Sequence, residues 1–238
     1  MSRALAIASR ELKAYLLTPG GYIIIALFLV LVGIYFSVRS FDLGQPSSLR
    51  AVFEVGTWLL LFVCPAITMR AISEERRLGT FEALMTAPVS EAEVVAGKYL
   101  AALAFLALML APTALHVAAL ELYGRPDYGE LLSGYLGMLL AGSAYLASGV
   151  LASVLTTSQV VAFLLTLFFW LTFNAGTRIL PQHVPQFWAD IVQSLDAQQR
   201  LGLFAIGLID TAGIVYFLSL TAVFLIAAVA ALLWRKMP

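Results

Sequence analysis

The sequence predicts an all-α membrane protein with six transmembrane helices, a short amphipathic helix before the first and a helical segment before the last. Of its 238 residues, 61% are hydrophobic and 12% are charged, whereas a soluble domain has about 45–50% apolar and roughly 25% charged residues. So few charges cannot cover a water-exposed surface. The apolar residues form continuous runs rather than alternating, which indicates helices and not the strands of a membrane barrel.

Six apolar runs approach the length of about 20 residues that a membrane-spanning helix needs. They cover residues 20–38, 55–72, 98–120, 131–155, 160–180 and 212–234. The first run is too long for the apolar region of a signal peptide, and a patterned polar segment precedes it, so we expect it to be retained.

The distribution of Lys and Arg predicts which way the helices face. With six spans, both termini share one side of the membrane with the segments after the second and fourth spans. That side carries nine of the 14 Lys and Arg residues. Because positive residues are enriched in cytoplasmic segments, both termini are expected to be cytoplasmic.

Residues 1–19 are too polar to span a membrane. Arg3, Arg10 and Lys13 share one helical face, and Leu5, Leu12 and other apolar residues lie opposite. This pattern predicts a basic amphipathic elbow helix on the cytoplasmic surface. Two interpretations stay open: a simple anchor, or an elbow that also contacts a cytoplasmic partner.

The segment 73–97 is the least membrane-like part of the chain. Four consecutive charges, Glu74 to Arg77, point all round a helix and cannot lie in lipid. Gly79 is expected to interrupt that helix. Ser90, with Glu93 three residues later, forms a capping-box pattern that opens the third span.

A helix of about two turns is predicted between these two points. Thr80 can cap its start, Glu82 in the first turn suits the helix dipole, and Pro88 ends it. Its apolar face would consist of Phe81, Leu84 and Met85. Because so short a helix is poorly stable alone, we interpret it as a knob that docks into a groove on another protein. The alternative is an ordinary solvated hairpin.

These residues carry a resemblance to a known family. Residues 74–90 follow the order E-E-R-R-x-G-T-x-E-x-L-x-x-x-P-V-S, and Gly97-Lys98 opens the next span. The order resembles the first cytoplasmic loop of ABC-2-type exporter permeases, a coupling helix that enters a cleft of the nucleotide-binding subunit. The resemblance implies ATPase coupling for Glu75, Arg77, Thr80, Phe81, Glu82, Leu84, Met85 and Pro88.

The resemblance extends over essentially the whole chain. Arg10-Glu11-Leu12 resembles the family's connecting helix, so the candidate elbow residues are Arg3, Arg10, Glu11 and Lys13. Pro19-Gly20-Gly21-Tyr22 and the start of the sixth span are similar to a smaller group, the permeases of gliding motility and of nitrous-oxide-reductase maturation. His116 has no counterpart in these motifs.

The resemblance implies a single permease domain, residues 1–238, with an elbow helix (1–19), a coupling loop (73–97) and an external helical or re-entrant segment (181–211). The chain has no G-x-x-x-x-G-K-[ST] motif, so ATP and Mg are expected on a separate ABC ATPase subunit. A second permease copy or a paralogue, membrane lipid and an external accessory protein are the other expected partners. The implied location is a bacterial-type cytoplasmic membrane.

Four polar residues are candidate substrate or external-gate contacts: Asn174, Arg178, Asp210 and His116. Asn174 and Arg178 lie one turn apart in the fifth span and are candidates to touch an anionic substrate. For Asp210 a solvated helix cap, and for His116 an interhelical polar contact, are the preferred interpretations. With 14 basic and 14 acidic residues and one cysteine, neither nucleic-acid binding nor a cysteine-rich metal site is expected.

Two other functions compete with that of a transporter subunit. An intramembrane enzyme is disfavoured, because Gly142-Ser143-Ala144 departs from the rhomboid motif and Glu74-Glu75 is followed by Gly79 where a CaaX-type protease would have Arg. A membrane platform that couples ATP hydrolysis to an external partner without transport has all the features of a permease. It stays an open alternative.

Overall fold

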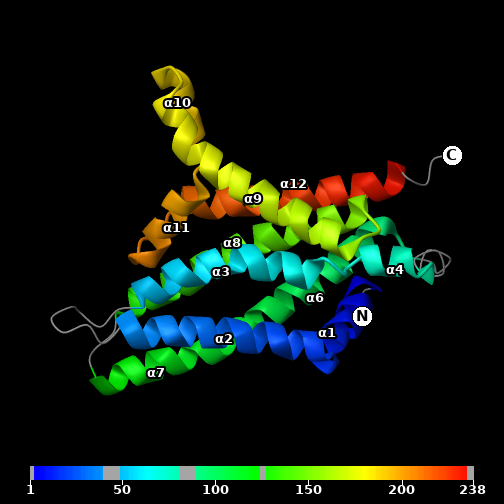
Figure 1. The fold of residues 1–238 in the computed structure, drawn as a ribbon, viewed down its shortest axis with the longest axis horizontal. Coiled ribbons are helices and arrows are strands. Elements are labelled where there is room, and N and C mark those ends of the chain that lie inside the picture. Colours follow the sequence, from blue (N-terminus) through cyan, green and yellow to red (C-terminus); the bar gives the residue numbers. More distant parts are fainter. Residues whose placement is uncertain (1–2, 40–48, 81–88, 124–126, 235–238) are drawn as a thin grey trace.

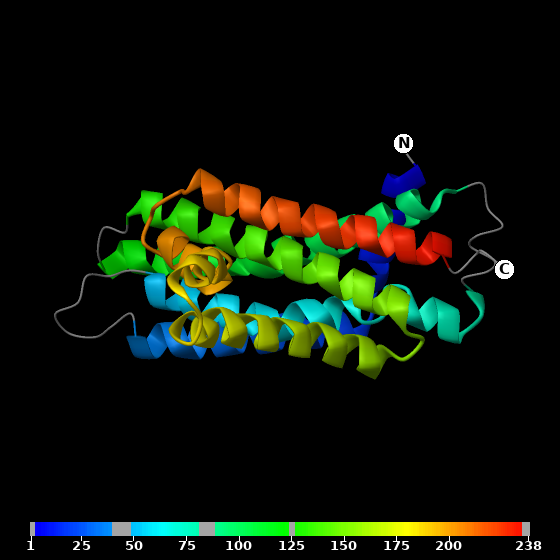
Figure 2. The same ribbon diagram turned by 90° about the horizontal axis from the view of Figure 1, so that it is seen from above.

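The computed structural model describes residues 3–39, 49–80, 89–123 and 127–234, and these ranges are helical, with no strand among them (Figure 1). Six helices are long and apolar enough to cross a membrane. They lie side by side in one bundle (Figure 2). The predicted all-α fold with six spans is therefore confirmed, and the chain is a multi-pass membrane protein.

Thirteen elements are described, and six helical stretches among them form the spans. In chain order they are α1 (Arg3–Leu17), α2 (Pro19–Arg39), α3 (Arg50–Thr68), α4 (Ser73–Arg77), α6 (Glu91–Leu110), the 3-10 turn η1 (Ala111–Thr113), α7 (Ala114–Tyr123), α8 (Tyr128–Leu155), α9 (Gln159–Ile179), η2 (Leu180–Gln182), α10 (Gln186–Ser194), α11 (Ala197–Ala205) and α12 (Thr211–Trp234).

The third span begins earlier than its hydropathy predicted. It covers Glu91–Leu122, whereas the apolar run begins at residue 98. The cause is the capping box, in which the Ser90 hydroxyl accepts from the Glu93 amide at 3.2 Å and the Glu93 carboxylate accepts from the Ser90 amide at 2.8 Å. Satisfying these two amides starts the helix in its polar first turn. Pro112 then interrupts the span within η1.

The centre of the bundle is α8, which packs against α3, α6, α9, α11 and α12. Its glycines permit this close packing of neighbouring helices. A Cβ at Gly142 would overlap Leu106 of α6, and one at Gly137 would lie 2.7 Å from Cβ of Phe204 in α11. The small residues of the fourth span thus form a packing seam between helices.

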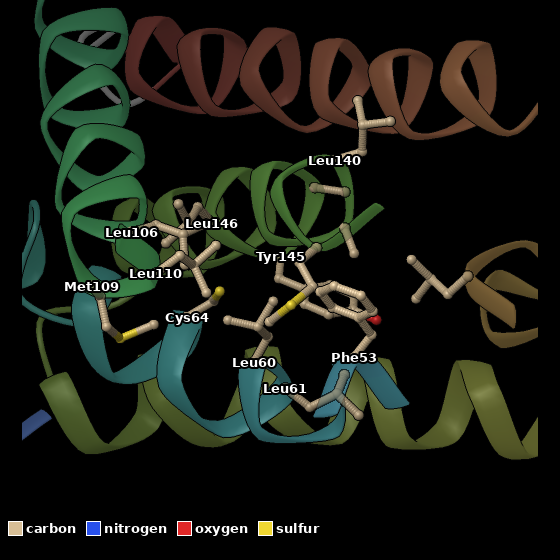
Figure 3. Packing of buried hydrophobic residues seen from close by; sticks show 14 of the residues in the cluster. Phe53, Leu60, Leu61, Cys64, Leu106, Met109, Leu110, Leu140, Tyr145 and Leu146 are labelled. Carbon is tan, nitrogen blue, oxygen red and sulfur yellow. The ribbon is translucent and has the colours of Figure 1, made fainter. Parts of the chain in front are cut away.

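Side chains from α3, α6 and α8 interlock in the core (Figure 3). Leu60, Leu106 and Tyr145 are fully buried there, and Tyr145 packs edge-on against Trp170 of α9, with ring centroids 4.5 Å apart. Cys64 is also buried in this core, so its role is that of a small apolar side chain.

The two ends of the bundle differ. At one end, here called the terminal end, α1 and α4 lie and α12 finishes; at the other, the far end, α7 finishes and α11 lies (Figure 1). The predicted helical segment before the last span forms two short helices. While α10 projects from the bundle, α11 packs against α8 and α3. Gly207, with φ of +88°, then turns the chain towards α12.

Candidate functional site

At the terminal end, the short helix α1 packs closely against the start of α6. A Cβ at Gly97 would lie 2.8 Å from both the Ala4 carbonyl oxygen and Cβ of Ile7. Only glycine fits so near a crossing backbone without displacement. Ile7 and Ala8 are buried on the face of α1 that meets the bundle. This close approach brings the charged residues of α1 within reach of the next residue of α6, Lys98.

Lys98 is the centre of a buried ion cluster, which we define as Arg10, Glu11, Glu75 and Lys98. The Lys98 ammonium lies 2.9 Å from Oε1 of Glu75 and 3.2 Å from Oε1 of Glu11. Arg10 lies 3.0 Å from Glu11 and 3.7 Å from Glu75. The cluster joins three elements, α1, α4 and α6, and its two cations balance its two carboxylates.

The cluster is shielded from water at its centre and open at its edge. The Lys98 side chain is only 1% exposed, whereas the Arg10 side chain is 60% exposed. A buried ammonium is tolerated only when anionic oxygens replace its water shell, and removal of one partner of a buried pair is costly. The packing of α1, α4 and α6 against one another therefore depends on the four charged side chains of the cluster.

A small cavity of about 220 Å³ adjoins the cluster, with Tyr15, Arg70 and Glu74 in its wall. Desolvation and the nearby Glu11 carboxylate raise the pKa of the Tyr15 phenol well above its usual range. Tyr15 therefore stays neutral. Within the described residues, Oε2 of Glu75 is buried and accepts no hydrogen bond.

The short helix α4 is also fixed to the end of α8. The backbone amides of Ile72 and Ser73 both donate to Oγ of Ser153 at 2.9 Å. The Arg76 guanidinium donates to the Val154 carbonyl oxygen at 2.6 Å. These bonds hold α4 to the most buried helix of the bundle, so displacement of α4 strains α8 together with α1 and α6.

Three of the eight residues assigned to ATPase coupling lie in the described ranges. Glu75 is part of the ion cluster, and Arg77 and Thr80 are exposed beside it. Gly79 interrupts the helix as predicted, with φ of +71°. The Thr80 hydroxyl donates to the Glu75 carbonyl oxygen at 3.2 Å and so closes the end of α4. The other five lie outside the described residues: Phe81, Glu82, Leu84, Met85 and Pro88.

The four elbow residues divide into two groups. Arg10 and Glu11 join the ion cluster. Arg3 and Lys13 are exposed and lie outside it. The single basic face that the spacing predicts therefore contributes one residue, Arg10, to the contact with α4.

The structure separates the two polar residues of the fifth span. The Asn174 side chain is buried and its amide donates to the Trp170 carbonyl oxygen of the same helix at 2.8 Å. Arg178 instead lies over the ring of Trp58 in α3, 5.8 Å from its centroid, at a cavity of the far end. Arg178 alone of these two lines a described cavity.

The other two candidates have local partners. Asp210 accepts from the Ala212 amide at 3.0 Å at the start of α12, and lies 3.9 Å from the Arg200 guanidinium. This is the helix-cap role that the sequence favoured. Nδ1 of His116 lies 3.1 Å from the Thr113 carbonyl oxygen of its own span. Its ring also contacts that of Phe36 in α2, 4.6 Å between centroids, and among the described residues it forms no hydrogen bond with another helix.

Sequence reasoning did not single out Lys98 as a site residue. In the sequence, Lys98 stands out only as one of the positive charges and as part of the Gly97-Lys98 pair that opens the third span. The available signal was its place in the apolar third span, because an ionisable residue within a span indicates a specific partner. Its partners could not be named from sequence, since Glu11 lies 87 residues away.

The six-helix bundle and its charged terminal end define a multi-pass α-helical membrane protein. A family model of ABC-2 family transporter proteins matches residues 8–236. The chain therefore belongs to the ABC-2 transporter family and is a membrane-spanning permease component of an ABC transporter. No curated protein gives a significant match.

Proposed function

We propose that this chain is the permease subunit of an exporter-type ABC transporter and is driven by a separate ATPase through the segment after α4. The observation that carries the proposal is the ion cluster, which joins α4 to α1 and α6 directly before that segment. A docked ATPase that pulls on residues 78–90 would move three helices rather than one loop.

The mechanical argument follows from the bonds around α4. Ser153 and the Val154 carbonyl hold one side of α4 to α8, and Lys98 holds the other side to α6. Because separating a buried ammonium from its carboxylates is costly, α4, α1 and the start of α6 move as a unit. Rotation of such a unit is a way to switch the packing of two permease halves.

The remaining parts of the proposal follow from family membership and charge. ATP and Mg would bind the partner ATPase, and a second permease, identical or paralogous, would complete the pathway. The Lys and Arg bias supports cytoplasmic termini in a bacterial cytoplasmic membrane. The narrower resemblance, to the gliding-motility and nitrous-oxide-reductase-maturation permeases, belongs to the same proposal.

Site-specific cross-linking tests the contact with the ATPase. Thr80→Cys places a thiol on an exposed residue of the proposed coupling segment, and Gln193→Cys places a matched thiol on exposed α10 at the far end. The natural Cys64 is buried, so the background is low. In membranes of the native host, only Thr80→Cys should form a cross-linked product that contains an ABC ATPase, identified by mass spectrometry.

The same experiment has a clear negative result. Equal cross-linking from both positions, or no ATPase in the Thr80→Cys product, would reject the coupling role. Phe81→Ala in the Thr80→Cys background should reduce the yield, because the sequence places Phe81 on the apolar face of the docking helix.

A further inference from the structure

A second cavity lies at the far end, remote from the ion cluster. Its volume is about 270 Å³, and α3, α8, α9 and α11 surround it. We call it the far-end cavity and define it by Phe53, Trp58, Arg178, Gln198, Gly202 and Phe204. Gly202 faces open space, because a Cβ added there would meet nothing within 4 Å.

The polar groups of this cavity include an exposed cation and one buried donor. Within the described residues, Arg178 has no carboxylate within ion-pair distance, and its described contact is with the Trp58 ring. Nε2 of Gln198 is buried without a hydrogen-bond partner. A buried donor without an acceptor is unfavourable by itself, so the arrangement calls for an acceptor from outside the chain.

The neighbouring charges do not supply that acceptor. Glu54 also lines the cavity, but its carboxylate accepts from Arg50 at 3.1 Å. Another arginine of this end, Arg200, has its own partners, the Ser194 carbonyl at 2.6 Å and Asp210. Arg178 thus differs from both of these arginines.

Apolar side chains also line the cavity. Phe53, Met138, Leu201 and Phe204 line it. A guanidinium fork and an amide donor bind carboxylate or phosphate oxygens, and apolar walls favour an attached hydrocarbon group. The volume suits a head group with a short apolar part rather than a whole lipid.

We propose that the far-end cavity binds the carboxylate or phosphate head of an anionic amphiphile, with Arg178 and Gln198 as donors. The head group has two sources, a lipid of the surrounding membrane or a transported amphiphile. Because the cavity is remote from α4, this proposal does not depend on coupling to an ATPase and is tested on the permease alone.

The test is a calorimetric titration of the purified chain in a neutral maltoside detergent. The probes are dihexanoyl phosphatidic acid, dihexanoyl phosphatidylcholine and inorganic phosphate. We expect phosphatidic acid to bind, and the other two to bind at least about tenfold more weakly, because each lacks either the net charge or the apolar part. The same titrations followed by tryptophan fluorescence should show a change on phosphatidic acid binding, and Trp58→Phe should reduce it, because the Trp58 ring lies beneath Arg178.

Variants locate the binding. Arg178→Gln should weaken phosphatidic acid binding about tenfold or more, and Gln198→Leu about threefold. Arg200→Gln is the matched control, since it removes an arginine of the same end outside the cavity, and should stay within about twofold of the original chain. Gly202→Phe fills the cavity without changing any charge, and should also abolish binding.

Several results would overturn the proposal. They are equal binding of the anionic and zwitterionic lipids, equal binding of inorganic phosphate, undiminished binding by Arg178→Gln, and no binding by the original chain. If Arg178→Gln does not fold, Gly202→Phe decides. A second titration separates the two sources: long-chain phosphatidic acid in nanodiscs should compete with the short-chain probe if membrane lipid occupies the site, and should not compete if the site is reserved for a transported molecule.

Discussion

The two ends of the bundle place arginines and lysines in opposite situations. At the terminal end, Lys98 is buried between Glu11 and Glu75 and every charge of the cluster is balanced. At the far end, Arg178 lies at an open cavity with an aromatic ring beneath it and forms no described ion pair, because Glu54 of that cavity pairs with Arg50. A balanced, buried cluster ties helices together, whereas an unbalanced, accessible cation is available to a ligand. In the two proposals above, the terminal end therefore transmits mechanical work and the far end binds a ligand.

The largest effect is expected from Lys98→Met. This change leaves Glu11 and Glu75 facing each other without the cation between them. We expect a loss of about 3 kcal/mol of unfolding free energy, near the lower value for breaking a buried pair because both carboxylates keep some contact with water. Denaturant unfolding of the purified protein measures it. The double variant Lys98→Met with Glu75→Gln should lose less than Lys98→Met alone; a larger loss would contradict the cluster's electrostatic role.

The next effect is expected from Gly97→Val, which tests how closely α1 must approach α6. The added methyl groups would overlap Ala4 and Ile7, so α1 must move away, with a loss of about 2 kcal/mol. The measurement is denaturant unfolding together with protease accessibility of α1. Gly202→Ala is the control at the far end; it meets open space and should stabilise α11 by up to about 1 kcal/mol.

A smaller effect is expected from Arg178→Gln, although it also removes a cation. The change leaves no described carboxylate without an ion-pair partner. The loss of unfolding free energy should therefore come from the contact with Trp58 alone and amount to no more than about 1 kcal/mol. This outcome, next to that of Lys98→Met, is the most direct test of the contrast between the two ends. A loss equal to that of Lys98→Met would show that Arg178 is structural.

The smallest effect is expected from Arg50→Gln. Its pair with Glu54, 3.1 Å long, joins two side chains that are 58% and 51% exposed. Exposed pairs of this i, i+4 type contribute about 0.3–0.5 kcal/mol and are screened by salt. Unfolding at low and high salt should show a difference within that range at low salt and almost none at high salt.

The parts of the fold that depend on local rules were predictable. The spans follow from runs of apolar residues, the start of α6 from Ser90 and Glu93, and the end of α4 from Gly79. Each of these depends on residues close together in the chain. Hydropathy alone placed the start of the third span too late, because it does not register a polar first turn that a capping box stabilises.

The parts of the sites that depend on distant residues were not predictable. Glu75 was a candidate for ATPase coupling, but its bond to Lys98 and their joint contact with Glu11 required the packing of α1 against α6 at Gly97. Asn174 and Arg178 looked equivalent, one turn apart, yet one is buried within the bundle and the other lines a cavity.

The sequence by itself determined that the protein has six helices able to span a membrane, where some of them begin or end, and which segment resembles the coupling loop of an ABC-2 permease. These properties follow from composition, local periodicity and capping, which need no knowledge of neighbouring helices. Only the tertiary structure decided that the Lys98 ammonium is paired with two carboxylates, whereas Arg178 forms no ion pair among the described residues. Charge pairing depends on distances of a few ångströms between helices far apart in the chain, and packing at glycines such as Gly97 and Gly137 sets those distances.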